Sequence, residues 1–466
     1  MKLTKLEFLL YASIIALLFC APAFYNGFPI LFPDSSSYIS AGFINKIQGS
    51  RPWLYSCFIR HISLWETLWL VIFVQGFLTA GVIYLMFKEF YKGKHQSKLF
   101  ILYSLIIGTT TAVSFHVSRL MPDIFTPIVI LIFILLLLEK HLSKKEKIFA
   151  IILFIIASGM HNSHLIMNIG MILVIVFGSI FKSLRSKYTE VGITRKKVGL
   201  LTLCVVCTHL FTCTVHYSIS GEFVATKGGS IFLFARLCDF GIAQAYLKEH
   251  CDEDLKGGIC DHPHKLFYAG NFLWNKKSYL NKSGGWTKKN EVYLGTLTKK
   301  ILTTPKYLKA YIIRSIEATF IQFFIFDYSP VEPYIKWVTG AVKSYYPMYI
   351  LAADGSRQMQ NTYNQNYVDF NNMIQQIVLF IAALLTFFLF WSSKVPDEQK
   401  ALTLLIIFAL LINAFIAAAT SGVYDRYQSR VNWLITLPVF WFICRYFSQN
   451  NLFTKKKQLE DEFPNS

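Results

Sequence analysis

The sequence has little charge for its length. Asp, Glu, Lys and Arg make up 16% of the 466 residues, whereas hydrophobic residues make up 54% and include 42 Phe, 25 Tyr and 9 Trp. Disordered chains have the opposite balance, because they lack the apolar side chains needed to bury a core. The apolar residues are also gathered into runs of about twenty. These features exclude a disordered chain and a soluble enzyme.

Several familiar catalytic signatures are also missing. The phosphate-binding pattern GxxxxGK[ST], the dinucleotide pattern GxGxxG, the zinc pattern HExxH and the nucleophile pattern GxSxG do not occur in usable contexts. The sequence shows no internal repeat of fixed period and no low-complexity tract. Any chemistry is therefore expected from polar residues at the ends of the apolar runs.

These apolar runs have the length of membrane helices. A bilayer core of about 30 Å is crossed by roughly 20 apolar residues in a helix. The predicted fold class is an all-α polytopic membrane protein with about ten transmembrane helices. The ten stretches are 6–24, 64–87, 99–115, 121–138, 148–160, 163–181, 198–219, 371–393, 401–420 and 431–447. Residues 1–24 also resemble a secretory signal, but the charges of the later loops alternate correctly only if this helix is retained.

The basic residues predict an orientation. The chain carries 46 Lys and Arg against 27 Asp and Glu, a formal net charge of +19. If the N-terminus is cytoplasmic, the short inside segments hold 22 Lys and Arg, the short outside loops hold 6, and 18 lie within 221–370. This distribution follows the positive-inside rule. Both termini are therefore expected in the cytoplasm, and the charge is assigned to topology and to contact with anionic lipids instead of nucleic acid.

The predicted organisation has four parts. They are a seven-helix module at 1–220 with a first outer loop at 25–63, a large extracytoplasmic segment with interfacial helices at 221–370 between helices seven and eight, a three-helix module at 371–447, and a cytoplasmic tail at 448–466. Within the large segment, 308–326 is apolar but contains Arg314, Glu317 and Gln322. Charges are costly in lipid. This stretch is therefore expected to lie in the interface or against the bundle.

The large segment also contains a predicted disulfide. Cys251 and Cys260 flank a turn-rich stretch in the compartment that is expected to be oxidising, so they are the favoured pair. Cys238 is the alternative partner. Most of the other cysteines lie in apolar runs, where a small buried thiol is the ordinary interpretation.

The first outer loop supplies the first candidate for chemistry. Asp34 lies in the run Phe32-Pro33-Asp34-Ser35-Ser36-Ser37-Tyr38, just beyond the first apolar stretch. A carboxylate near the outer membrane surface can accept a proton from an acceptor hydroxyl or amine, or help to bind a cation. Asp34 can equally be the N-cap of a helix that begins at the serines. The sequence leaves both interpretations open.

Two further sets lie in later outer loops. His116, Arg119 and Asp123 lie between predicted helices three and four, where Asp123 can act as a helix cap and Arg119 is the only basic residue. His161 and His164 lie at a hairpin tip. Together with His116 they could form a zinc site, or they could serve as hydrogen-bonding or interfacial histidines.

The last set is the run Tyr424-Asp425-Arg426-Tyr427-Gln428-Ser429-Arg430. Two arginines on the outer side oppose the positive-inside trend and need a counter-ion. Asp425 can provide one as a structural salt bridge, and a bound phosphate or pyrophosphate is the functional alternative. If all four sets converge, their chemistry suits a phosphorylated membrane lipid and a polar reactant that is delivered outside.

These features resemble the GT-C superfamily of integral-membrane glycosyltransferases, which includes protein O-mannosyltransferases and aminoarabinose transferases. The likeness is carried by the first-loop acid and aromatic run ending in Tyr38, by Arg51-Pro52-Trp53-Leu54-Tyr55, which is similar to an R-P-x-x-Y pattern, by the second-loop acid Asp123, and by a final outer loop that contains Arg426-Tyr427. Seven helices before a large outer segment also match this plan. The first loop departs from the family in having one acid instead of an acidic pair.

The resemblance implies roles for these residues. Asp34 would be the catalytic base, and Asp123 would be a second acid that orients the acceptor or a metal. Arg426, together with Arg119 and Arg430, would hold the lipid-linked phosphate. The remaining substrate-binding candidates are Tyr38, Arg51, Tyr427, His161 and His164. No cofactor is required by these patterns, and a divalent metal stays an open alternative.

The predicted function is transfer of a sugar from a polyprenyl-phosphate donor to a lipid, glycan or protein acceptor, with inversion at the anomeric carbon. The predicted location is a bacterial inner membrane, with the active site facing outside. One alternative is another glycan-lipid transferase or polymerase that uses the histidines. A second is a lipid or solute transporter without enzymatic activity, although the sequence shows no inverted repeat of broken helices.

Overall fold

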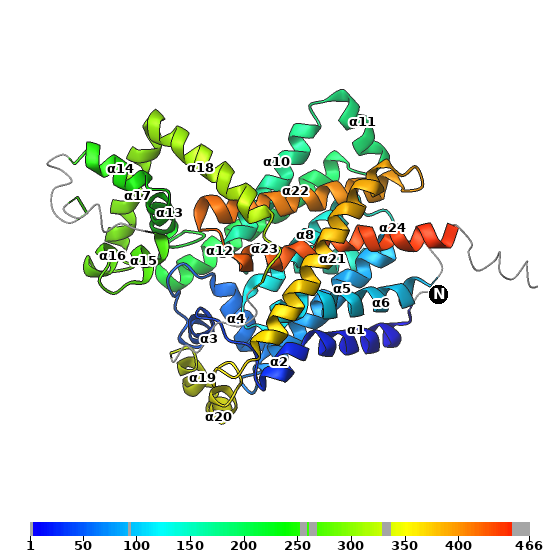
Figure 1. Cartoon of the computed structure of the whole chain (residues 1–466), viewed down its shortest axis with the longest axis horizontal. Coiled ribbons are helices and arrows are strands. Elements are labelled where there is room, and N and C mark those ends of the chain that lie inside the picture. The colour runs from blue at the N-terminus through cyan, green and yellow to red at the C-terminus, as the bar shows by residue number, and fades with distance from the viewer. Residues whose placement is uncertain (1–2, 92–94, 252–258, 261–267, 329–336, 450–466) are drawn as a thin grey trace, which may run out of the picture.

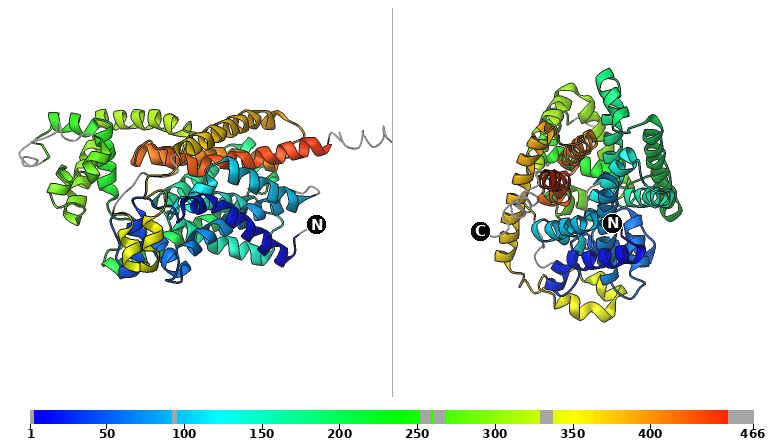
Figure 2. Two further views of the ribbon diagram at one scale, coloured as in Figure 1. Left: turned by 60° about the horizontal axis from the view of Figure 1, so that its bottom comes forward. Right: turned by 90° about the vertical axis from the view of Figure 1, so that its right-hand side faces the viewer.

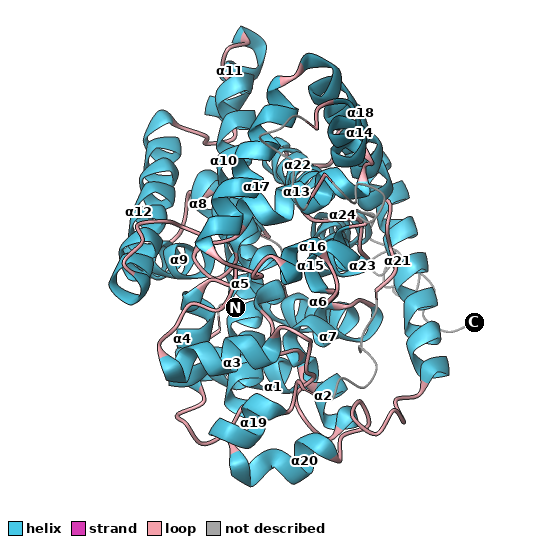
Figure 3. Cartoon of the chain, turned by 90° about the vertical axis from the view of Figure 1, so that its left-hand side faces the viewer, coloured by secondary structure: helices cyan, strands magenta, loops and turns pink. Residues whose placement is uncertain are grey.

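A computed structural model describes the chain except for residues 1–2, 92–94, 252–258, 261–267, 329–336 and 450–466. All regular structure in the described residues is helical (Figure 3). One isolated parallel bridge joins Ile30 to Arg119. The tail that was predicted at 448–466 lies outside the described residues from 450 onward.

The helices follow one another with short connections. The first part of the chain forms α1 (Lys5–Phe19), α2 (Ala21–Asn26), α3 (Ser35–Ile44), α4 (Trp53–Ile62), α5 (Trp69–Phe90), α6 (Gln96–Thr110), α7 (Val113–Ser118), the 3-10 turn η1 (Pro122–Ile124), α8 (Phe125–Leu138), α9 (Lys144–Ser158), α10 (Asn162–Gly178), α11 (Lys182–Glu190) and α12 (Arg195–Ser220). The middle part forms α13 (Gly229–Asp239), α14 (Ile242–Glu249), α15 (Ala269–Trp274), α16 (Tyr279–Lys282), α17 (Lys288–Thr303), α18 (Pro305–Phe323), α19 (Gly340–Tyr345), η4 (Pro347–Tyr349) and α20 (Ile350–Asp354). The last part forms α21 (Gln365–Trp391), α22 (Asp397–Thr420), α23 (Asp425–Asn432), η5 (Trp433–Ile435) and α24 (Thr436–Gln449).

Among the described residues, four helices are long and apolar enough to cross a membrane, namely α5, α12, α21 and α22. The bent pairs α10 with α11 and α13 with α14 raise this number to six if each pair is one span. The other predicted stretches contain shorter helices, because turns interrupt the apolar runs. A separate α2 begins at Ala21, with Pro22 in its first turn, and Thr111 is extended between α6 and α7.

The sides of the long helices carry exposed apolar residues. Leu203 and Leu210 of α12 are 58% and 50% exposed, and Phe380 and Phe387 of α21 are 59% and 61% exposed. Keeping such faces in water costs about 25 cal/mol for each Å² of apolar surface. Lipid removes that cost, so the several long apolar helices indicate a membrane protein.

Helix α8 forms the centre of the bundle. Its sequence, FTPIVILIFILLLL, is apolar around nearly the whole helix, and all 14 residues are buried. A helix without a polar face has to be surrounded by other helices. Helices α5, α9, α12 and α22 pack around it. The segment just before α8, which contains Asp123, is thereby held at one end of the bundle.

Lysine-rich loops meet at one place in the fold. Lys88 pairs with Glu146, and Lys140 pairs with Glu398. The ammonium of Lys197 donates a hydrogen bond to the Glu139 carbonyl. The inside segments of the charge count include 88–98, 139–147, 182–197 and 394–400, and these contacts join all four. The guanidinium of Arg445 in α24 adds a hydrogen bond to the carbonyl of Phe90 at the end of α5, at 3.1 Å.

The first helices of the middle part form a lobe at the opposite end from the N-terminus. Helices α13 to α17 gather there, whereas the N-terminus and the end of α24 lie at the other end (Figure 1; Figure 2). The lobe has its own buried apolar cluster, which includes Phe234, Leu247, Phe272 and Leu297.

Helix α18 leads from the lobe back along the bundle. It packs against α22, and its Arg314 and Glu317 form an exposed ion pair at 3.1 Å. Gln322 exchanges two hydrogen bonds of 2.8 Å with the backbone of Tyr424. The stretch predicted at 308–326 therefore lies against the bundle, with its charged residues facing outward.

A disulfide closes one loop of the lobe. It joins Cys251 to Cys260, with their Cα atoms 6.0 Å apart, whereas Cys238 is a buried free thiol. Closing a loop of this length lowers the conformational entropy of the unfolded chain, and this raises the free energy of unfolding by about 2–3 kcal/mol. We expect Cys251→Ser to lower the unfolding temperature of the purified protein. In the free-thiol control Cys207→Ser the unfolding temperature should be unchanged, and equal stability of both variants would contradict the expectation.

Candidate functional site

Two distant loops are joined by backbone hydrogen bonds. The Ile30 N–H donates to the Ser118 carbonyl at 2.9 Å, and the Leu120 N–H donates to the Ile30 carbonyl at 3.0 Å. The hydroxyl of Ser35 donates to the carbonyl of Leu120 at 2.9 Å. These bonds place the first outer loop, which contains Asp34, beside the segment that leads to Asp123.

Two glutamines that sequence reasoning missed hold this junction. Gln75, buried in α5, donates to the carbonyls of Val117 and Arg119 at 2.8 and 3.1 Å. Gln358 accepts from the Leu31 N–H at 3.0 Å and donates to the Leu31 carbonyl at 2.6 Å. The sequence contained a signal for Gln75, because it is a neutral amide inside an apolar helix and a buried amide needs hydrogen-bond partners. Gln358 lies in a polar stretch and had no such signal.

Asp34 is the residue before α3, but its side chain makes no capping hydrogen bond. Its carboxylate forms an ion pair with the guanidinium of Arg51, and the two side chains are 27% and 19% exposed. The N-cap interpretation is therefore wrong for this side chain. The structure brings two predicted site residues, Asp34 and Arg51, into direct contact and leaves both partly accessible.

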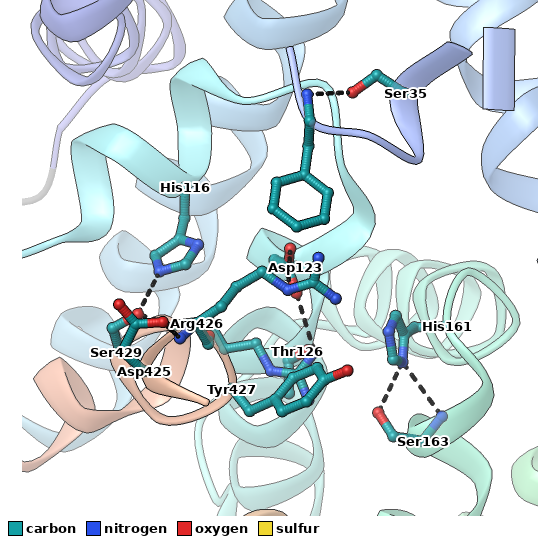
Figure 4. A network of polar contacts seen from close by, with 12 residues as sticks. Ser35, His116, Asp123, Thr126, His161, Ser163, Asp425, Arg426, Tyr427 and Ser429 are labelled. Atoms are coloured by element: carbon teal, nitrogen blue, oxygen red, sulfur yellow. Dashed lines mark hydrogen bonds and ion pairs between the residues drawn. The ribbon is translucent and has the colours of Figure 1, made fainter. Parts of the chain in front are cut away.

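Asp123 is the counter-ion of both Arg426 and Arg430, and Figure 4 shows it beside Arg426. Its Oδ1 accepts a hydrogen bond from Arg430 Nη1 at 3.0 Å, and its Oδ2 lies 3.8 Å from Arg426 Nε. Arg430 is 2% exposed and also donates to Asn413 Oδ1 at 2.9 Å. The sequence suggested Asp425 for this role. Asp425 is instead the first residue of α23, and its Oδ1 accepts from the backbone N–H of Arg426 at 2.6 Å.

This arrangement argues against the role expected for Asp123. The side chain is fully buried, and each of its oxygens faces a guanidinium group. A buried carboxylate held by two arginines is stabilised as an anion and is not free to orient an acceptor. Asp123 therefore positions the arginines. Of the two acids predicted to be catalytic, Asp34 and Asp123, only Asp34 is partly accessible.

Arg426 differs from Arg430 in its contacts. Its guanidinium carbon lies 4.3 Å from the centre of the Phe32 ring and 5.0 Å from that of Tyr427. Within the part of the chain that the structure describes, its guanidinium N–H groups donate no hydrogen bond, and the side chain is 15% exposed. An arginine fixed by aromatic rings with unused donors is suited to bind an oxyanion.

Arg119 and Phe32 complete this group. Arg119 is 2% exposed, and its guanidinium carbon lies 5.4 Å from the centre of the Phe32 ring. Phe32 therefore contacts both Arg119 and Arg426. Sequence reasoning treated Phe32 only as part of the loop pattern, because the apposition of distant arginines on one ring is not visible in a linear sequence.

Tyr38 is a buried residue of α3, close to the charges of Asp34 and Arg426. Its ring packs edge to face on Tyr55, with 5.0 Å between ring centres. Burial, followed by the nearby charge of Asp34, raises the pKa of the Tyr38 hydroxyl above its usual value, and Arg426 is close enough to oppose this shift. Tyr38 is therefore neutral at pH 7 and can donate a hydrogen bond.

The predicted histidines make separate contacts. His116 Nε2 lies 3.0 Å from Ser429 Oγ, and burial, with a smaller effect of Arg119, lowers the pKa of His116 to about 3. His161 Nδ1 lies 2.7 Å from Ser163 Oγ, and burial, followed by the charge of Arg430, holds its pKa well below the usual value. Both imidazoles are therefore neutral at pH 7.

The zinc alternative is not supported by these positions. His164 uses both ring nitrogens, with Thr126 Oγ1 at 2.9 Å and the Ala157 carbonyl at 2.8 Å. Among the described residues, no group of three or more His, Cys, Asp or Glu side chains has an arrangement that could hold a metal ion. The rings of His161 and His164 lie 5.4 Å apart and line the hairpin tip beside the arginines.

Similarity gives no additional information about this site. No protein-family model, no curated protein and no solved structure matches the chain.

Proposed function

We propose that this chain is a membrane glycosyltransferase of the GT-C type. One observation carries the proposal. The guanidinium of Arg426 lies 4.3 Å from the ring of Phe32, two residues before Asp34, although Asp34 and Arg426 are 392 positions apart in the sequence. A partly exposed carboxylate next to a guanidinium with free donors is the pair of groups that transfer from a sugar phosphate requires.

In this proposal Arg426 binds the phosphate of a polyprenyl-phosphate sugar. The acceptor oxygen forms a bond to the anomeric carbon as the bond from that carbon to the phosphate oxygen breaks. The proton of the acceptor hydroxyl passes to Asp34, and the negative charge that develops on the departing phosphate is stabilised by Arg426. Direct displacement of this kind inverts the anomeric carbon. Arg51 holds the Asp34 carboxylate in place, and Tyr38 offers a hydroxyl beside it.

The topology that belongs to this proposal has ten membrane segments, both termini in the cytoplasm, and the site facing outward from a bacterial inner membrane. Two observations support it. The lysine-rich loops meet through ion pairs, and the lobe formed by α13 to α17 lies at the opposite end from the N-terminus (Figure 1). A polyprenyl donor would reach the site from the lipid that covers the apolar helix faces.

Asp34→Asn should abolish transfer, because the amide cannot accept the acceptor proton. Loss of a general base costs about 10²–10⁴ in rate. The measurement is consumption of a panel of radiolabelled polyprenyl-phosphate sugars by the reconstituted protein, first with wild type to find the donor. Glu317→Gln, which removes an exposed acid of α18, is the control and should be fully active.

Three results would redirect the proposal. Full activity of Asp34→Asn would remove Asp34 as the base. Loss of activity in His161→Ala and His164→Ala, with Asp34 dispensable, would indicate a different glycan-lipid transferase or polymerase. Flux of a lipid or solute through proteoliposomes without chemical conversion would indicate a transporter.

A further inference from the structure

An aromatic cluster lies on the surface of the lobe, outside the site described above. The indoles of Trp274 and Trp286 stack with 5.4 Å between ring centres and 26° between ring planes. Phe232 supports both from α13, at 5.2 Å from Trp286 and 6.4 Å from Trp274. Trp274 is 54% exposed. The indole of Trp274 is thus held by the rings of Trp286 and Phe232, while much of its surface is exposed to solvent.

The surroundings of this indole are polar and basic. Trp274 is the only exposed large apolar residue in the fully described stretch 271–289. The same stretch contains five exposed lysines, which are Lys276, Lys277, Lys282, Lys288 and Lys289. It contains no Asp or Glu. Its nearest carboxylate contact is the pair of Lys288 with Glu222, at 3.6 Å.

These surroundings distinguish the cluster from a lipid anchor. Exposed Leu64 and Trp65 in the turn between α4 and α5, and exposed Met348 and Leu351 in η4 and α20, combine aliphatic and aromatic residues. Residues of that kind suit the membrane interface. The stretch 271–289 exposes no aliphatic side chain, and the first exposed one that follows is the single Val292 of α17, at 61%. A flat indole in a stretch that also carries side-chain amides and lysine ammonium groups instead matches a ligand with an apolar face and negative charge at its edge.

The cluster is connected to the candidate site by direct contacts. Gly228 has a φ of +75°, and a Cβ atom added there would lie 2.9 Å from the Trp286 ring and 3.9 Å from Ser50. The amide of Asn162 donates to the Ser50 carbonyl at 2.6 Å and to Thr226 Oγ1 at 2.9 Å. Ser50 precedes Arg51, the partner of Asp34. Only a few residues therefore separate the indoles from the proposed base.

We propose that Trp274, backed by Trp286 and Phe232 and flanked by the lysines, binds an anionic pyranose glycan. The C–H face of the sugar ring packs on the indole, and the lysines neutralise carboxylate or phosphate groups on the glycan. This inference rests on the proposed function for its biological meaning, namely that the bound glycan is the acceptor. Binding itself requires no transfer and can be measured separately.

The test uses purified full-length protein and three probes. Pentagalacturonate is an anionic pyranose, maltopentaose is a neutral one, and inorganic polyphosphate has charge without a sugar face. We expect pentagalacturonate to bind more tightly than maltopentaose, and its affinity to fall with rising salt. Trp274→Ala should weaken it about fivefold, the scale of one aromatic contact. Trp391→Ala, at an indole that is 77% exposed in α21, is the matched control and should bind as wild type does.

A second variant tests the same inference in case Trp274→Ala does not fold. The double change Lys276→Gln and Lys277→Gln should weaken pentagalacturonate at low salt and leave maltopentaose unchanged. Equal binding by Trp274→Ala and Trp391→Ala would overturn the inference. An equal loss of affinity for polyphosphate and for pentagalacturonate in Trp274→Ala would also overturn it. So would stronger quenching of tryptophan emission by brominated lipid in wild type than in Trp274→Ala. Retained glycan binding without any transfer would instead count against the proposed function alone.

Discussion

Replacing Asp123 by Asn is expected to destabilise the protein more than any other single change in the site. Asp123 is fully buried and neutralises Arg430 at 3.0 Å and Arg426 at 3.8 Å. Without the carboxylate, two guanidinium groups remain in the interior with no counter-charge from this position. Breaking a buried pair on one side costs about 3–5 kcal/mol. In detergent, Asp123→Asn should therefore unfold at a much lower temperature or fail to accumulate.

The control for this experiment is Glu317→Gln. Glu317 pairs with Arg314 at 3.1 Å, but the two side chains are 53% and 60% exposed. Exposed pairs contribute about 0–1 kcal/mol. Glu317→Gln should therefore unfold at nearly the wild-type temperature. If Asp123→Asn were equally stable, the buried cluster would not hold the loops together, and the assignment of Asp123 as the residue that positions the arginines would be wrong.

Much of the helical architecture could be predicted from the run lengths and charges. The apolar pattern of α8 requires burial on every side, and the structure buries all of its residues. The stretch 308–326 was expected to lie in the interface or against the bundle, and α18 packs against α22. That this stretch does not span the membrane stays a prediction. The exact number of spans was less predictable, because local breaks such as the one between α1 and α2 divide a continuous apolar run into shorter helices.

The pairing within the site could not be predicted, because it depends on contacts between distant segments. Asp123 and Arg430 are 307 residues apart, and nearby Asp425 was a reasonable choice of counter-ion from the sequence alone. The brace between Leu31 and Gln358 joins residues 327 apart. Residue type and outer-loop position identified Asp34, Asp123 and the arginines as candidates. These residues differ in their roles because they differ in burial and in their contact partners, and both are determined only by the folded chain.

That separation of roles predicts opposite results for the two neighbouring arginines. Arg430 donates to Asp123 and Asn413, and it should behave as a structural residue. Arg426 makes no hydrogen bond from its guanidinium within the described residues, and it lies against the rings of Phe32 and Tyr427. Arg430→Lys should therefore lower stability, whereas Arg426→Lys should unfold near the wild-type temperature.

Arg426→Lys is expected to lose transfer although the charge is kept. Lysine offers a single ammonium group in place of the planar fork that binds two phosphate oxygens, and it cannot stack between two rings in the same way. Removing one donor that stabilises a developing oxyanion lowers kcat about 10²–10³-fold. The assay measures kcat and KM for the polyprenyl-phosphate sugar identified with wild type, and Arg314→Lys on exposed α18 is the control. A fall in kcat with an unchanged unfolding temperature is expected, because the contact strengthens as the phosphate leaves. Wild-type kcat in Arg426→Lys would show that the free guanidinium does not contact the leaving group, and the phosphate would then have to be held elsewhere in the cluster.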